Sequence, residues 1–108
     1  MMIARPQRPT LAAELNRFIA GAIARGSTEA AEVYYLACRE FLSVIAVRYA
    51  DQILPEHVGA FHKALFSRGV SIRTVNNRHA SVKAFLRFLG HDTKTLPKPS
   101  VITIKPAT

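Results

Sequence analysis

Three observations predict that this chain has an all-α fold, a compact bundle of four helices. Apolar residues recur at spacings of three and four in four separate stretches, as the buried stripe of a helix requires. Glycine, proline or a capping hydroxyl residue stands at the boundaries of these stretches. No window alternates strongly between apolar and polar residues, apart from the short Val-Ile-Thr-Ile run at 101–104. The short connections imply that successive helices pack against one another.

The first two helices follow one another across a short turn. The first begins after Thr10, a plausible N-cap, and ends at Gly26. Its apolar stripe consists of Leu11, Leu15, Phe18, Ile19, Ala22 and Ile23. Ser27 or Thr28 caps the second helix, which we expect to end near Ala50. The apolar stripe of this second helix consists of Tyr34, Ala37, Cys38, Phe41 and Ile45.

The third and fourth helices have equally clear boundaries. Pro55 suits the first turn of the third helix, and Gly69 stops it. Its stripe consists of Val58, Phe61, Leu65 and Phe66. Ser71 opens the fourth helix, which is expected to run to Gly90. The core face of the fourth helix consists of Ile72, Val75, His79, Val82, Phe85 or Leu86, and Leu89.

Segments of different composition flank the expected helical domain at residues 10–90. Residues 1–9 hold two prolines and no apolar periodicity, which predicts a flexible arm. Residues 91–108 hold three prolines and three lysines, a composition typical of an extended, solvated linker. A linker at this place in the sequence leads us to expect a further domain that is absent from the chain.

The net charge of +8 lies almost entirely in the second part of the chain. Residues 1–67 carry +1, whereas residues 68–108 carry +7, from eight Lys or Arg residues against Asp92 alone. Charge asymmetry of this kind indicates a polyanionic partner, either a nucleic acid or an anionic membrane.

Several classes of protein and site are not expected. Cys38 is the single cysteine, so it forms no internal disulfide and is expected to be a small buried hydrophobe. No apolar stretch approaches the length of a signal sequence or the ~20 residues of a membrane span, so a cytoplasmic protein is expected. His57 and His62 are five residues apart and do not share a helical face, which argues against a metal site. His79 lies on an apolar stripe and is expected to be a core histidine.

The outer side of the fourth helix carries the candidate functional residues. Spacings of three, four, three and four place on one face Arg73, Asn76, Ala80, Lys83 and Arg87, flanked by Asn77 and Ser81. Arg and Lys contact phosphate or guanine, Asn can pair with adenine, and the major groove admits an α-helix. No acidic residue occurs between Arg68 and Gly90, whereas an ordinary solvated face, the alternative interpretation, usually mixes charges of both signs.

The stretch SIRTVNNRHASVKAFLRFLG at 71–90 resembles the fourth helix of the core-binding, SAM-like N-terminal domain of tyrosine recombinases and phage integrases. The residues that fit the family pattern are Thr74, Asn76, Arg78, Lys83, Phe85, Phe88 and Leu89. The stretches TLAAELNRFIA, YYLACREFLSVIA, ILPEHVGAFHKALFSRGVS and LPKPSVITIKPAT are similar to its first three helices and its linker, so the resemblance covers roughly residues 10–105. His79, Ala80 and Asn77 depart from the Leu, Ser and Arg that are usual in the family.

This resemblance implies a SAM-like orthogonal bundle that forms one half of a C-shaped clamp on double-stranded DNA. The second and fourth helices would lie toward the groove. The catalytic groups of such recombinases belong to the other half, so we expect this chain to bind DNA without cutting it and to need no cofactor. Its partners would be that catalytic domain and sister protomers on DNA, whereas the chain alone is expected to be monomeric and not bound to a membrane.

The candidate DNA contacts are distributed over two helices. The full set is Arg73, Thr74, Asn76, Asn77, Arg78, Lys83, Arg87, Ser27, Thr28 and Arg39. We expect phosphate contacts from the cations of the fourth helix and base-edge contacts from its asparagines. Ser27 and Thr28 serve equally well as helix caps. Basic residues of the two flanking segments can follow the DNA backbone, namely Arg5, Arg8, Lys94, Lys98 and Lys105. The alternative function is a stand-alone helical module whose basic face meets an acidic protein.

Overall fold

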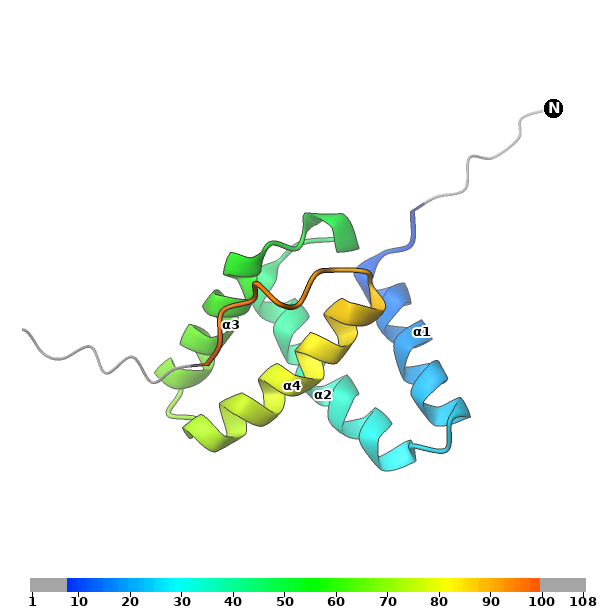
Figure 1. Ribbon diagram of the computed structural model, residues 1–108, viewed down its shortest axis with the longest axis horizontal. Helices are drawn as coiled ribbons and strands as arrows, with labels where there is room; N and C mark the ends of the chain where they lie inside the picture. The colour runs from blue at the N-terminus through cyan, green and yellow to red at the C-terminus, as the bar shows by residue number, and fades with distance from the viewer. Residues whose placement is uncertain (1–7, 100–108) are drawn as a thin grey trace, which may run out of the picture.

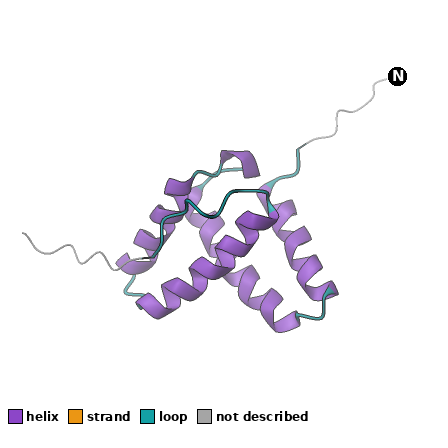
Figure 2. Cartoon of the chain, viewed as in Figure 1, coloured by secondary structure: helices purple, strands orange, loops and turns teal. Residues whose placement is uncertain are grey.

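The computed structural model describes residues 8–99 and confirms the all-α fold. The helices are α1 (Leu11–Ala24), α2 (Thr28–Ile45), α3 (Pro55–Ser67) and α4 (Ile72–Phe88), with a single 3₁₀ turn, η1 (Ala50–Gln52), before α3 (Figure 1). Between residues 8 and 99 there is no strand (Figure 2). The alternating run at 101–104 lies outside the described residues.

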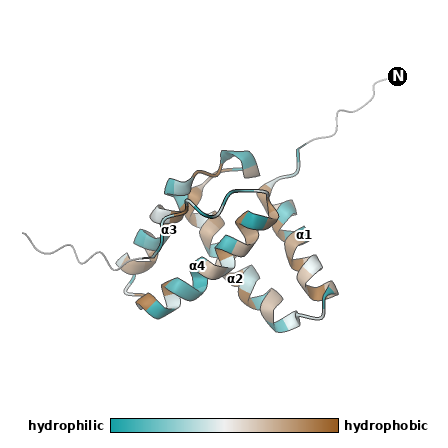
Figure 3. Ribbon diagram, viewed as in Figure 1, coloured by the Kyte–Doolittle hydropathy of each residue, from teal (hydrophilic) through white to brown (hydrophobic). Residues whose placement is uncertain are grey.

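The two central helices, α2 and α4, cross each other, and each of them contacts the other three helices (Figure 1). The core lies around this crossing. Phe41 of α2 meets Phe61 of α3 edge to face at 5.4 Å between ring centroids, and Phe18 of α1 lies 5.4 Å from Phe85 of α4. Aromatic pairs at such separations stabilise a core beyond the area that they bury. The outer side of α4 carries many of the hydrophilic residues (Figure 3).

Local signals set most helix boundaries as predicted. The Thr10 and Ser71 hydroxyls accept hydrogen bonds from backbone N–H groups in the first turns of α1 and α4, each at 3.2 Å. Pro55 begins α3, and His57 Nδ1 accepts from the Leu54 backbone N–H at 2.8 Å. These bonds satisfy N–H groups that have no partner within the helix.

The end of α2 is a correction to the sequence prediction. The helix ends at Ile45 rather than near Ala50, because Ala46 adopts a left-handed conformation with φ of 52°. The backbone carbonyl of Arg48 then accepts a hydrogen bond from the Leu11 N–H at 2.9 Å. The Gln52 side chain accepts from the N–H groups of residues 48 and 49, both at 3.0 Å. Partners elsewhere in the fold thus replace the bonds that a longer helix would have made.

Several residues also differ from their predicted burial. Ile23 and Ile72, expected in the core stripes, are 52% and 38% exposed because they lie near helix ends, beyond the crossing. Ser81, expected at the edge of the exposed face, is buried at the α2–α4 crossing, where its carbonyl lies 3.7 Å from Cys38 Sγ. His62, which was left out of the predicted stripe of the third helix, is buried, and Phe85 and Leu86 are both buried rather than one of them.

Residues 91–99 return along the domain rather than extending into solvent. His91 Nε2 is hydrogen-bonded to the carbonyl of Ala50 at 2.8 Å, and Leu96 packs against the core. Pro97 lies beside Gly59 of α3, where an added Cβ would meet the proline ring at 3.6 Å. At the other end, Arg8 pairs with Asp51 at 3.0 Å.

Candidate nucleic-acid interface

The predicted face of α4 is exposed in the folded domain. Its five residues are all exposed except Lys83, which is half-buried. At 1.5 Å per residue, Arg73 and Arg87 lie about 21 Å apart along the helix axis. The major groove is about 12 Å wide, so two cations at this separation can reach phosphates on both of its sides. The small side chain of Ala80 between them permits close approach.

The cations of this face make no ion pair with any other residue of the described chain. The four ion pairs within residues 8–99 are Arg8–Asp51, Arg17–Glu14, Arg68–Glu40 and Arg78–Glu40. Arg73, Lys83 and Arg87 belong to none of them, and Arg87 makes only a 3.4 Å hydrogen bond to the Thr93 hydroxyl. Three positive charges are therefore available to an anionic partner.

Arg78 and Thr74 are placed differently from the other candidates on α4. Arg78 pairs with Glu40 of α2, which also meets Arg68 at 3.4 Å. This carboxylate therefore links α2 to α4 and to the turn after α3, and it balances the charge of Arg78. Thr74 is half-buried, and its hydroxyl lies 3.1 Å from the Ser71 hydroxyl in the first turn of the helix.

The candidates around the start of α2 do not join the face of α4. Ser27 and Thr28 are exposed, and Ser27 occupies the N-cap position without a capping side-chain bond. Arg39 is exposed on the side of α2 that faces α1, where it lines a shallow groove with Asn16 and Tyr35. Of the basic residues predicted in the two flanking segments, Arg8, Lys94 and Lys98 are exposed. Arg5 and Lys105 lie outside the described residues.

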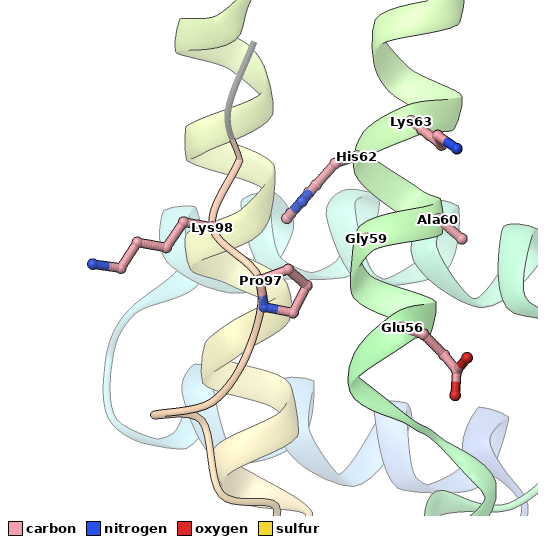
Figure 4. Close-up of a pocket in the computed structure, with 7 residues that line it drawn as sticks. All are labelled: Glu56, Gly59, Ala60, His62, Lys63, Pro97 and Lys98. Atoms are coloured by element: carbon pink, nitrogen blue, oxygen red, sulfur yellow. The ribbon is translucent and has the colours of Figure 1, made fainter. Parts of the chain in front are cut away.

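Behind the basic face, two histidines join α3 to α4. His62 Nε2 lies 2.9 Å from His79 Nδ1, and His62 points from α3 toward α4 beside Pro97 (Figure 4). Burial, and to a smaller extent the charge of the neighbouring His79, lower the pKa of His62 to about 4. Burial and then the charge of Lys83 lower the pKa of His79. Both rings are therefore neutral at pH 7. The described residues contain no cluster of three or more metal-ligating side chains.

Sequence reasoning missed two exposed apolar residues at the edge of this surface. Val33 and Leu36 of α2 are each 56% exposed, and they lie across a small groove from Asn77 and Arg78. Both residues lie outside the apolar stripe of α2, on the side of the helix that is normally polar. This position could have identified them from the sequence.

Comparison with known proteins gives one match. Residues 20–95 match the family model described as phage integrase, N-terminal, a span that includes all of α2, α3 and α4. No curated protein and no solved structure matches significantly. None of the helices in residues 8–99 combines the length and apolar character needed to cross a membrane.

Proposed function

Because the chain belongs to the phage integrase N-terminal domain family, we propose that it is the core-binding domain of a tyrosine recombinase, which grips duplex DNA during site-specific recombination. The observation that carries this proposal is the exposed face of α4, with three cations outside any ion pair of the described residues and no acidic residue on the helix. The partners on DNA would be the catalytic domain of the recombinase and sister protomers.

In this proposal α4 lies along the major groove. Arg73 and Arg87 neutralise phosphates at the two ends of the helix, and Lys83 adds a third contact. Asn76 and Asn77, both exposed, present amides to the base edges between them. The phosphate contacts supply affinity without sequence preference, whereas the amides supply sequence preference.

The test is fluorescence anisotropy of a labelled duplex, titrated with the protein at several salt concentrations. Each phosphate neutralised contributes about 0.9 to the slope of log affinity against log salt. The triple variant R73A/K83A/R87A should therefore flatten the slope by about 2.7 and weaken binding to all sequences.

The matched control is the triple variant R25A/R48A/K63A, which removes the same charge from exposed positions on other parts of the domain. It should retain most of the affinity and of the salt slope. Equal losses in the two triple variants would show that net charge, not the face of α4, determines binding.

The alternative, a module that binds an acidic protein, is disfavoured by the composition of the same face. Its five residues include no Trp or Tyr, and these aromatic side chains are enriched among the residues that dominate binding energy at protein interfaces. Competition distinguishes the two functions, since heparin displaces a protein from DNA-like contacts but leaves a shaped apolar interface largely intact.

A further inference from the structure

The groove between the N-terminal half of α2 and the start of α4 has an unusual lining. Val33, Leu36 and Ala37 line it from α2, and Asn77, Arg78 and Ser81 line it from α4. Val33 and Leu36 are the most exposed large hydrophobic residues of the described chain. An exposed apolar pair beside an amide and a guanidinium indicates contact with a partner that has an apolar group and a hydrogen-bonding edge.

The size of the groove restricts what can occupy it. Its volume is about 140 Å³, below the roughly 300–1,000 Å³ of pockets that bind drug-sized ligands. A partner helix would need a longer row of apolar contacts. The face of α2 does not provide one, because Glu29 and Glu40 lie one turn before Val33 and one turn after Leu36. The groove suits a small apolar group, such as a methyl, presented beside a polar edge.

Duplex DNA presents this combination in its major groove. The C5 methyl of thymine is the apolar group there, and the paired adenine offers N6 and N7 to an asparagine amide. Asn77 follows Asn76 directly and lies one turn after Arg73, so the groove adjoins the basic face of α4. A duplex held on that face would bring its base edges to Val33 and Leu36.

The charges around the groove favour contact with bases over contact with the DNA backbone. Glu40 pairs with both Arg68 and Arg78, so these three residues together carry a net charge of only +1. Glu29 and Glu32 are exposed in the first two turns of α2 and repel phosphate. The approach of DNA to α2 is thereby limited to the neighbourhood of the crossing with α4.

We propose that this groove reads thymine: Val33 and Leu36 contact a thymine C5 methyl, and Asn77 hydrogen-bonds an adenine, so that the domain prefers an A·T pair at this position. This inference rests on the proposed DNA-binding function. It adds a base preference and assigns it to residues on two helices.

The experiment uses deoxyuridine, which lacks only the C5 methyl. Duplexes are selected by the protein from a pool with randomised central positions, and the best binders are remade with deoxyuridine in place of each thymidine in turn. Loss of one buried methyl contact should weaken binding about fourfold at one or two positions. The double variant V33A/L36A should bind the thymidine duplex more weakly and lose no further affinity with deoxyuridine. N77A should lose the preference for A·T over G·C but stay sensitive to the methyl.

A control variant, I23A/L54A, truncates two exposed apolar residues elsewhere and should behave like the parent protein. Thermal melting of every variant checks that the fold is intact. Selection that enriches no A·T pair, or binding that is unchanged by deoxyuridine at every position, would overturn the thymine proposal and leave DNA binding standing. Failure to bind any duplex would overturn both proposals. If the parent protein self-associated in sedimentation, and V33A/L36A abolished this association but left the deoxyuridine effect unchanged, the groove would be a protein interface instead.

Discussion

Lowering the pH from 7 to 5 should destabilise the folded domain through His62. The folded state holds the pKa of this residue at about 4, against 6.5 for an ordinary histidine. Between these values the unfolded chain binds a proton that the folded chain does not, so the free energy of unfolding falls as the pH falls. Above pH 6.5 both states hold His62 neutral, and the stability of the domain is not reduced by this residue. As the pH falls from 6.5 toward the folded pKa, the free energy of unfolding decreases progressively.

The magnitude follows from the two pKa values. At pH 5 the protonation of His62 in the unfolded chain lowers the free energy of unfolding by about 2 kcal/mol. For a domain of this size, such a loss lowers Tm by about 10 °C. His79 shifts in the same direction and adds to the effect.

Urea denaturation of the parent protein and of the double variant H62Q/H79N at pH 7, 6 and 5 measures this effect. The amides of the variant can replace the hydrogen bond between the rings but do not titrate. The free energy of unfolding of the parent should fall by about 2 kcal/mol more than that of the variant. Equal stability of the parent at pH 7 and pH 5, or the same loss in the variant, would refute the assignment to this pair.

Three further predictions concern the fold. S71A should lower the free energy of unfolding by about 1 kcal/mol because it removes a capping hydrogen bond. S27A should change the free energy of unfolding little because Ser27 makes no such bond. Chemical denaturation of the two variants measures the difference. A46G should raise the free energy of unfolding by about 0.5–1 kcal/mol, because glycine relieves the strain of a left-handed residue. Ala46 is exposed, so the substitution loses no packing. An unchanged Tm would contradict this prediction. Burial raises the pKa of Cys38 to about 12, so a thiol reagent at pH 8 should label it only as fast as the domain opens; labelling in native buffer as fast as in urea would place the thiol at the surface.

Helix positions and the exposed face of α4 could be read from the sequence because both depend on residues close together in the chain. A hydroxyl residue such as Thr10 or Ser71 caps the turn that directly follows it. The spacing of Arg73, Lys83 and Arg87 places them on one side of a helix whatever the helix packs against. The opposite side of α4 was correctly assigned to the core for Val75, Val82 and Phe85 by the same periodicity.

The role of each charge was not available from the sequence. Helical spacing places Arg73 and Arg78 on different sides of α4, but nothing in the sequence shows that one of them is paired with a carboxylate. In the folded domain Glu40, thirty-eight residues before Arg78, pairs with it and leaves Arg73 unpaired within the described residues. The partner of a charged side chain on another helix depends on the position at which the two helices cross.

The sequence by itself therefore determined the all-α class, the four helices and the basic face of α4, since caps and periodicity act within a few residues of the chain. Only the tertiary structure decided the early end of α2, the burial of His62 and Ser81, and the groove that Val33 and Leu36 form with Asn77. These features depend on the crossing of α2 and α4. The position of a crossing is set by the packing of whole side-chain surfaces, which the period of one helix does not specify.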